Sequence, residues 1–418
     1  MERETLAILV GGGPAPGING VIASATIEAI ARGLRVRGLY DGYRWLIAGD
    51  TEHTVELEAE HVSRIHFTGG SILRTSRSNP GRSINDLEQV VHTLTLLGVR
   101  YLICIGGDGT TYGAARIAEQ AQERIGVVAV PKTIDNDIAL PENAPTFGYE
   151  TARTVGTSIV ESLMEDARTT ERWYLAISMG HKSGALALGM CKAAGAMLAA
   201  IPEEFHDEKI DLSVLVDTIV GAIVKRRAQG YGDGVAVVAE GIAERLDPES
   251  VPGLRESVKT AHDHIHLADV PFGAFLRDRV HAALEELGIT MTVVTKDIGY
   301  ELRCAKPLPF DVEYARTLGY GAVRHLLRGG SGTLIAITGG RVSPVPLATM
   351  RDPVSGHIRV RMVDVTTEAY EVARSYMTRL EVEDFAEPHL SRIAAHTTLS
   401  PQRFRERFLP ATQATSRR

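Results

Sequence analysis

GVVAVPKTIDND, residues 126–137, is the stretch that decides the fold class of this chain. Its apolar run, Gly126–Val130, predicts a buried strand, and two aspartates and a lysine follow the run. In an open α/β sheet, ligands bind beyond the carboxyl ends of the strands. A carboxylate to accept a hydroxyl proton, a cation, and a second carboxylate for Mg²⁺ together suit phosphoryl transfer. The alternative is a solvated turn whose Asp and Asn side chains bond their own backbone.

Two more apolar runs are each followed by a glycine-rich turn and a predicted helix. Leu6–Val10 precedes GGGPAPGING at 11–20, and Tyr101–Ile105 precedes GGDGTT at 106–111. Free backbone N–H groups and the positive end of a helix both favour an anion. Asp108 in the second turn could hold Mg²⁺ on a polyphosphate. One such turn is explained by chain reversal alone, but two of them favour phosphate binding.

The loop FTGGSILRTSR, residues 67–77, lies between these turns in the sequence. Its hydroxyls, backbone amides and two arginines, Arg74 and Arg77, suit a phosphate, although a solvated surface loop has the same composition. Apolar spacing predicts helices that begin at Ile18 and near Tyr112.

The rest of the chain continues the alternation of strands and helices that is typical of an α/β protein. The predicted strands are Arg172–Ser178, Val235–Ala239, Met291–Val294 and Thr333–Ile337. The predicted helices are Ile84–Leu97, 155–167, 185 to about 200, Phe272–Leu287 and 312–327, and a strand and a helix between 358 and 380. The mostly polar residues from Pro410 onward are expected to fray.

Composition gives no support for several classes of function, although it leaves room for a locally basic pocket. Of 418 residues, 45 are Lys or Arg and 52 are Asp or Glu, so the net charge of −7 gives no support for a nucleic-acid or anionic-membrane surface. The three cysteines lack metal-binding spacing, and no stretch approaches the roughly 20 apolar residues of a membrane span. Alternating histidines at 262, 264 and 266 lack the spacing of a helical zinc pair. We therefore expect a cytoplasmic protein.

Taken together, these motifs resemble the phosphofructokinase family. The string GGDGT alone is shared with other kinases, but TIDND at 133–137 and Met179-Gly180 further along are more specific. The resemblance extends from Leu6 to about Gly340, with an extra segment near 242–290. It implies the phosphofructokinase fold, which has two Rossmann-like three-layer α/β domains with a cleft between them. The expected phosphoryl-donor domain is 1–148 with 306–350, the sugar-phosphate domain is 149–305, and 351–418 is a C-terminal extension.

The resemblance also implies roles for individual residues. Asp135 would be the general base on the sugar 1-hydroxyl, beside Lys132 and Thr133, with Mg²⁺ near Asp108 and Asp137. The residues implied for the phosphoryl donor are Gly13, Arg77, Gly107, Asp108, Gly109 and Thr110. Those implied for fructose 6-phosphate are Thr133, Asp135, Arg172, Met179, Gly180, His181, Glu240, Tyr300 and Arg303. Arg172 matches a family arginine that reaches a neighbouring subunit's substrate, which implies a homodimer or homotetramer with shared sites.

Three positions depart from the family pattern. His181 stands where the family usually has arginine, Val294 stands where a second arginine is expected, and Tyr300 stands where histidine is common. A neutral imidazole stabilises a transferring phosphoryl less well than a guanidinium does. These changes leave open another acceptor, such as sedoheptulose 7-phosphate, or a regulatory subunit of low activity.

The residues at positions 109 and 132 bear on the identity of the phosphoryl donor. In this family, members that use pyrophosphate as donor have an aspartate directly after Gly-Gly-Asp and a lysine before Thr-Ile-Asp. Here the first position is Gly109, although Lys132 is present. Because a missing carboxylate leaves room for a nucleotide, we expect ATP as donor, with pyrophosphate as the alternative. The function expected from the sequence is a Mg²⁺-dependent 6-phosphofructokinase.

Overall fold

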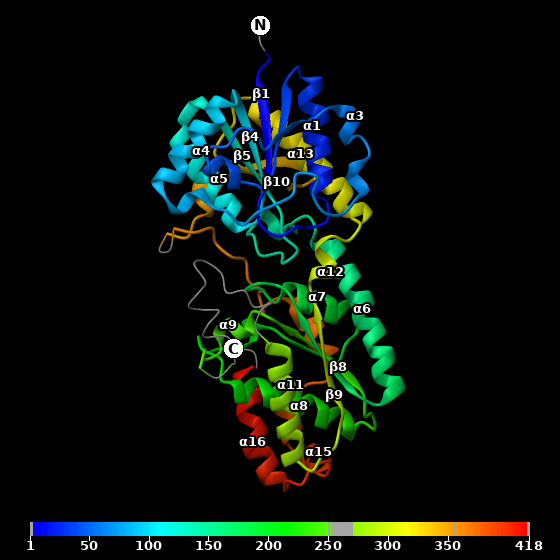
Figure 1. The fold of residues 1–418 in the computed structure, drawn as a ribbon. Coiled ribbons are helices and arrows are strands. Elements are labelled where there is room, and N and C mark those ends of the chain that lie inside the picture. The colour runs from blue at the N-terminus through cyan, green and yellow to red at the C-terminus, as the bar shows by residue number, and fades with distance from the viewer. Residues whose placement is uncertain (1–2, 250, 252–270, 354–355, 416–418) are drawn as a thin grey trace. The chain divides into compact units, whose positions relative to one another are not determined.

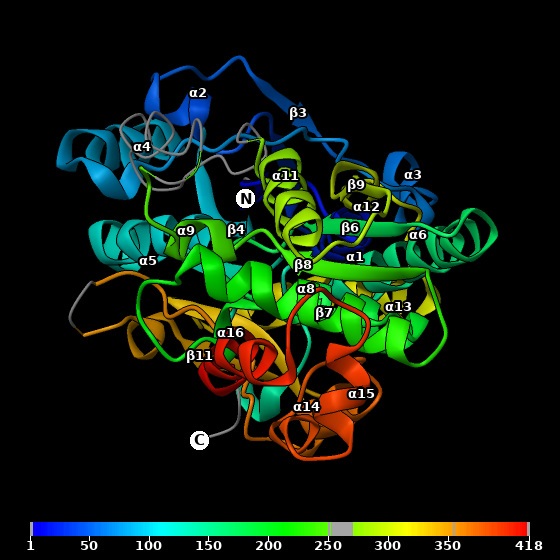
Figure 2. The same ribbon diagram turned by 90° about the horizontal axis from the view of Figure 1, so that it is seen from below.

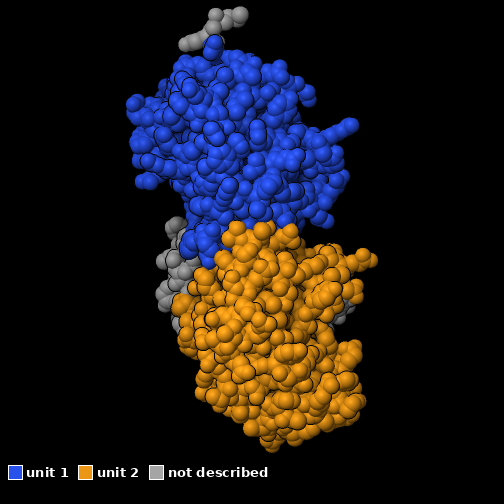
Figure 3. All heavy atoms as spheres, turned by 90° about the vertical axis from the view of Figure 1, so that its right-hand side faces the viewer, with its two compact units in different colours: residues 1–152, 300–361 blue, residues 153–299, 362–418 orange. Residues whose placement is uncertain are grey.

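The computed structural model describes residues 3–249, 251, 271–353 and 356–415. The chain forms two compact units, which are coloured separately in Figure 3. Unit 1 contains residues 1–152 and 300–361, and unit 2 contains residues 153–299 and 362–418. The chain therefore leaves each unit and returns to it. The assignment of donor and sugar-phosphate roles to these parts stays a prediction.

Unit 1 is built on a seven-stranded sheet with the order β11-β10-β5-β4-β1-β2-β3. The five inner strands are parallel, and the two edge strands are antiparallel to their neighbours. The strands are β1 (Thr5–Val10), β2 (Arg35–Leu39), β3 (Thr54–Glu56), β4 (Val99–Gly106), β5 (Gly126–Pro131), β10 (Thr333–Thr338) and β11 (Arg341–Pro346). The helices are α1 (Ile18–Ala31), α2 (Arg44–Ile47), α3 (Ala59–Val62), α4 (Ile84–Leu96), α5 (Asp108–Ala121), α12 (Tyr300–Arg303) and α13 (Pro309–Leu327).

Helices cover both faces of this sheet, so unit 1 has three layers (Figure 1). Alternate residues of β1 point to opposite faces, as in any strand. Leu6, Ile8 and Val10 pack with α1 and α13, whereas Ala7 and Leu9 pack with α4 and α5. All five side chains are fully buried, which explains why β1 is a continuous apolar run rather than an alternating one.

Unit 2 has a smaller parallel sheet with the order β7-β8-β6-β9. Its strands are β6 (Trp173–Ser178), β7 (Leu198–Ala200), β8 (Gly234–Ala239) and β9 (Val293–Ile298). Its helices are α7 (Ala185–Ala194), α8 (Leu212–Ala228), α9 (Ile242–Arg245), α11 (Phe272–Glu286), α14 (Glu368–Ser375), α15 (His389–Ala394) and α16 (Pro401–Ala414), and α6 (Tyr149–Thr170) continues into it from unit 1. One hydrophobic core contains α8, α11 and the side chains of one face of the sheet. Helices α6 and α7 contact each other where Gly156 lies against Met190.

The C-terminal residues are part of the core of unit 2. α15 and α16 lie against α8 (Figures 1 and 2), and Phe404 and Phe408 of α16 are fully buried there. The expectation that residues from Pro410 onward fray is wrong as far as Thr415, because α16 continues through Pro410 to Ala414. The last three residues lie outside the described part of the chain.

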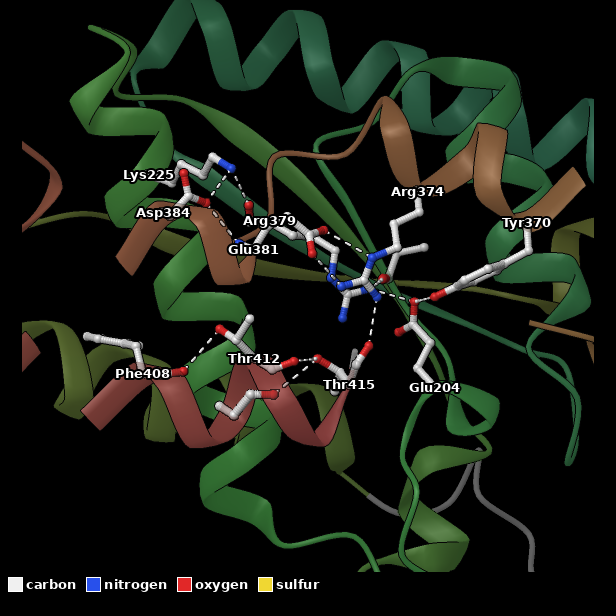
Figure 4. Close-up of polar contacts among 12 residues, drawn as sticks. Glu204, Lys225, Tyr370, Arg374, Arg379, Glu381, Asp384, Phe408, Thr412 and Thr415 are labelled. Carbon is white, nitrogen blue, oxygen red and sulfur yellow. Dashed lines mark hydrogen bonds and ion pairs between the residues drawn. The ribbon is translucent and has the colours of Figure 1, made fainter. Parts of the chain in front are cut away.

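A buried polar network ties this segment to the rest of unit 2 (Figure 4). Arg379 forms an ion pair with Glu204 at 2.5 Å, and the exposed fractions of the two side chains are 2% and 0%. The hydroxyl of Tyr370 donates to the same carboxylate at 2.6 Å. Because a carboxylate buried this deeply needs hydrogen-bonding partners, Glu204 fixes the position of the segment from Tyr370 to Arg379.

Four predicted elements differ from the structure. α5 begins at Asp108 rather than near Tyr112, so the second glycine turn is shorter than expected. The helix expected up to residue 200 ends at Ala194, where Gly195 adopts φ 73°, and the short strand β7 follows. β9 begins two residues after Met291 and continues to Ile298. Between 358 and 380, the structure has single-residue bridges at Ile358 and Val360 instead of a strand.

Candidate active site

The turns after β1, β4 and β5 lie at one edge of the sheet in unit 1. Val10 is in register with Ile105, which is in turn in register with Val130, because the three strands are parallel neighbours. The main-chain N–H of Lys132 then donates to the oxygen of Gly106 at 3.0 Å. Residues that are far apart in the sequence are therefore adjacent here, as expected for the ligand edge of an open sheet.

Lys132 is at the centre of this edge. Its side chain is only 4% exposed, and its amino group donates to the main-chain oxygen of Gly13. Burial and, to a smaller extent, the nearby Arg303 guanidinium lower the pKa of Lys132 to about 8, although the charges of Asp135, Asp137 and Asp108 oppose the shift. The charges of these four side chains all act on one buried amine, so the predicted base and the predicted metal carboxylates lie around a common point.

Two of the glycines are required by a close approach. A Cβ atom at Gly11 or at Gly106 would lie 2.3 Å from the hydroxyl oxygen of Thr110. The main-chain oxygen of Thr110 accepts a hydrogen bond from the Tyr43 hydroxyl at 3.0 Å, and both side chains are buried. Thr110 is therefore locked between the first and second glycine turns, with Gly107 and Asp108 at the N-terminus of α5. Free N–H groups at a helix N-terminus favour an anion.

The loop that carries Asp135 has a specific backbone conformation. The main-chain N–H of Asp135 donates to the hydroxyl of Thr133 at 3.0 Å. Asn136 follows with φ 55°, a left-handed conformation that Asn tolerates better than most residues. The hydroxyl of Thr146 donates to the Thr133 oxygen at 2.9 Å and closes the loop. The direction of the Asp135 side chain therefore depends on how firmly Asn136 is held.

Arg303 lies in unit 1, close to the first glycine turn. A Cβ atom at Gly13 would be 3.4 Å from the guanidinium carbon of Arg303, which also lies 5.1 Å from the ring centre of Tyr300. Both residues belong to α12 and to unit 1, although the expected sugar-phosphate domain extended to residue 305. Lys132 and Arg303 thus place two cations beside the Gly13 backbone.

The segment before Arg77 is bound to the same turn. The N–H of Gly12 donates to the Ser76 oxygen at 2.8 Å, and the Thr75 hydroxyl donates to the Gly12 oxygen at 2.5 Å. Asn19, which was not predicted as a site residue, is 2% exposed, and its side-chain amide donates to the Thr68 hydroxyl at 3.0 Å in the loop before this segment. The sequence signal for it is a polar residue directly after Ile18, where the glycine-rich turn passes into the helix.

A second group of predicted residues lies in unit 2, after β6 and β8. One carboxylate oxygen of Glu240 accepts from the N–H groups of Gly180 at 3.0 Å and His181 at 3.1 Å. His181 has φ 53°, and Met179 packs on Gly299, where a Cβ atom would lie 2.8 Å from the Met179 methyl carbon. Glu240 therefore holds the turn at Met179–His181 in shape.

Arg172 is separated from this turn. It precedes β6, whereas Met179 follows it, so the six-residue strand places them about 20 Å apart at about 3.3 Å per residue. The Arg172 side chain is 34% exposed and lies 4.0 Å from Asp166. Within this subunit Arg172 cannot share a ligand with Met179–His181.

Mg²⁺ would need ligands beyond the protein side chains. Among the described residues, no three His, Cys, Asp or Glu side chains are close enough to hold a metal by themselves. Asp108 and Asp137 both act on Lys132, and one or two carboxylates completed by phosphate oxygens and water form the ligand set that Mg²⁺ prefers. The residues present fit that ion. Histidines 262, 264 and 266 lie outside the described residues.

Among the described residues, no helix is both long enough and apolar enough to cross a bilayer. The expected cytoplasmic location stays a prediction.

Comparison with known proteins identifies relatives of nearly the full length. Residues 5–326 match the family model described as phosphofructokinase. The chain is 49% identical to a pyrophosphate–fructose 6-phosphate 1-phosphotransferase of Thermotoga maritima, covering 98% of this chain and 99% of that protein. It is 46% identical to the enzyme of the same name from Naegleria fowleri, covering 97% and 95%.

Solved structures share the fold. A pyrophosphate-dependent phosphofructokinase from Nitrosospira multiformis superposes with a TM-score of 0.68 at 16% identity, covering 90% of this chain and 92% of that one. Phosphofructokinase from Pichia pastoris gives a TM-score of 0.66 at 21% identity, and this chain spans 99% of its own length but 39% of the yeast chain. The three-layer α/β architecture predicted from the sequence is confirmed.

The expectation of ATP as donor is wrong. The relatives at 49% and 46% identity are named for pyrophosphate, which favours the alternative that the sequence left open. A Cβ atom at Gly109 would lie 3.7 Å from the Asn79 amide nitrogen, an ordinary van der Waals distance, and Tyr112, one turn later on α5, packs against the ring of His357. The absence of a carboxylate at position 109 removes a repulsion but is compatible with either donor.

Proposed function

The chain belongs to the phosphofructokinase family, and we propose that it transfers a phosphoryl group from pyrophosphate to the 1-hydroxyl of fructose 6-phosphate, with Mg²⁺. The observation that carries the proposal is the position of Lys132, buried among Asp108, Asp135, Asp137 and Arg303. The names of the two relatives support the choice of donor and acceptor.

The residues of unit 1 suit the proposed transfer. Asp135 accepts the proton of the sugar 1-hydroxyl while the oxygen of that hydroxyl attacks the phosphorus atom. The bond from phosphorus to the leaving phosphate breaks in the same transfer. Lys132 and Arg303 stabilise the charge on the transferring group, and the Gly107–Thr110 turn presents N–H groups to the donor. Asp108 and Asp137 would hold Mg²⁺, which would supply positive charge against the negative charge of pyrophosphate. Catalysis is mainly positioning and charge stabilisation.

The residues of unit 2 suit the acceptor. The turn at Met179–His181 and the carboxylate of Glu240 form the proposed sugar site. Arg172, at the other end of β6, acts on the substrate of a neighbouring subunit. The proposed assembly is therefore a homo-oligomer with shared sites, and its subunit number follows from light scattering of the purified protein.

Steady-state kinetics with fructose 6-phosphate test the function. Turnover with pyrophosphate should exceed turnover with ATP at equal concentration, and an Asp135→Asn variant should lose both. Turnover with ATP alone would reject the donor. Binding of fructose 6-phosphate without turnover from either donor would instead support a regulatory subunit.

A further inference from the structure

The last residue of unit 1, Arg361, binds the loop that carries Asp135. Its Nε donates to the main-chain oxygen of Asn136 at 2.8 Å, and its Nη1 donates to the oxygen of Ala144 at 2.9 Å. Its Nη2 donates to the side-chain oxygen of Asn136. The main chain takes part as well, because the Arg361 N–H donates to the oxygen of Asp137 at 2.7 Å.

These contacts join the two arms of the loop. Asn136 and Asp137 lie on the outgoing arm, and Ala144 lies on the returning arm, two residues before Thr146. The N–H of Thr146 donates to the same Asn136 side-chain oxygen at 3.2 Å. A bridge between Ile138 and Val360 continues the contact by one residue on each side. The guanidinium therefore joins both arms, in addition to the two hydrogen bonds that Thr146 makes between them.

Only an arginine can make this set of contacts. The planar guanidinium presents donors in a fixed fork, whereas a lysine carries one ammonium nitrogen at the end of a flexible chain. Three acceptors in different directions match the fork and cannot be reached from one nitrogen. Burial lowers the pKa of Arg361, the charge of Asp137 raises it, and an arginine remains charged at any ordinary pH.

We propose that Arg361 is a positioning residue for the general base. Asn136 adopts φ 55°, a conformation that the surrounding bonds must hold, and Asp135 immediately precedes it. By fixing the carbonyl and the side chain of Asn136, Arg361 fixes the direction in which the Asp135 carboxylate points. This inference rests on the proposed function, because it assigns Asp135 the role of base.

Arg361→Lys is the variant that tests it, and Arg359→Lys is the matched control. Arg359 lies two residues away on the same segment, is exposed, and its side chain donates to the Thr349 oxygen at 2.5 Å. Small displacements of a reacting group cost about 10²-fold in rate, so kcat of Arg361→Lys should fall by at least ~10-fold. KM for fructose 6-phosphate should stay within about twofold, because the proposed acceptor contacts at Met179–His181 and Glu240 are not touched by the substitution. Arg359→Lys should match the wild type in both constants.

Chemical rescue separates positioning from general destabilisation. Free guanidinium ion at millimolar concentration should restore part of kcat to Arg361→Ala, and it should leave Arg359→Ala unchanged. Amide hydrogen exchange provides a readout without substrate. Exchange in residues 133–146 should be faster in Arg361→Lys and unchanged in Arg359→Lys.

Failure of the role proposed for Arg361 can be distinguished from failure of the proposed function. A wild-type protein without phosphoryl transfer would reject the proposed function, whatever the exchange data show. Unchanged exchange in residues 133–146, or a kcat of Arg361→Lys within threefold of the wild type, would overturn the role of Arg361. A fall in kcat that Arg359→Lys shares would overturn it too.

Discussion

The amino group of Lys132 donates a hydrogen bond to the main-chain oxygen of Gly13, so the residue after β5 is bound to the turn after β1. This contact buries the amine within the candidate active site. Burial lowers the pKa of Lys132 to about 8, whereas the unfolded value is near 10.5. Two consequences of this shift can be measured.

The first consequence concerns activity. A protonated Lys132 is needed to stabilise the transferring phosphoryl group, so kcat/KM should fall as the pH rises through about 8. Lys132→Arg keeps the positive charge at all these pH values. The decline of kcat/KM should therefore begin at a higher pH in this variant, although kcat itself falls. A wild-type profile that stays flat to pH 9.5 would reject the role of Lys132.

The second consequence concerns stability. Between the folded value of about 8 and the unfolded value near 10.5, the unfolded chain binds more protons at Lys132 than the folded chain does. The contribution of this group to the free energy of unfolding should therefore increase as the pH rises through that window. Lys132→Met should remove the increase, which urea denaturation at pH 7.5 and pH 10 can detect.

Asp135 is the residue on which the proposed chemistry depends most. Asp135→Ser should lower kcat by at least ~10²-fold, the scale of losing a general base. Its KM for fructose 6-phosphate should change much less. Asp207→Ser, in an exposed loop of unit 2, is the control for a lost carboxylate. A variant at 135 within tenfold of the wild type would remove the assignment.

Tyr112 offers a test of the proposed preference for pyrophosphate over ATP. Its ring centre lies 5.3 Å from that of His357 and 5.5 Å from the guanidinium carbon of Arg351, and a Cβ atom at Gly81 would lie 2.6 Å from its ring. Because this face of α5 adjoins Gly109, the filled space is expected to exclude a nucleoside.

ATP should therefore not compete with pyrophosphate in the wild type, and Tyr112→Ala should make it a measurable competitive inhibitor. Tyr376→Ala is the control, because that side chain is 77% exposed in unit 2. Equal inhibition of both variants would argue against a steric explanation.

The ion pair between Arg379 and Glu204 predicts a large loss of stability when it is broken. Arg379→Met leaves a buried carboxylate without its cation and should lower the free energy of unfolding by about 3–5 kcal/mol. Adding Glu204→Gln removes the stranded charge, keeps an acceptor for Tyr370, and should restore more than half of the loss. The exposed pair of Arg168 and Glu165 is the control, because Arg168→Met should cost at most about 1 kcal/mol.

The sequence predicted most accurately what depends on local pattern. β1, β4 and β5 are apolar on both faces, and their predicted bounds differ from the observed ones by at most two residues. The turn after β4 was predicted too long, because the small and glycine residues at 109–111 resemble a loop, although they form the first turn of α5. β7 was missed because its three residues continue the apolar pattern of a helix.

Contacts between distant parts of the chain could not be predicted, because no local sequence pattern indicates them. Arg361 binds Asn136 across 225 residues, and nothing in its own segment distinguishes it from Arg359. Arg303 could be assigned to the substrate only by resemblance, and its place beside Gly13 follows from the return of the chain to unit 1 at Tyr300. The site residues that directly follow strands could therefore be predicted from the sequence. The distant residues that bind and position them could not.

The discontinuity of both units has a consequence for synthesis on the ribosome. Unit 1 lacks β10, the strand between β5 and the edge strand β11, until residue 338 has emerged, and the core of unit 2 lacks Phe404 and Phe408 until α16 has been made. Neither half can fold early as an independent nascent domain, so long apolar strands such as β1 and β4 remain exposed while translation proceeds. Chaperone demand during expression should accordingly be high, and removing α16 should yield aggregated rather than merely inactive protein.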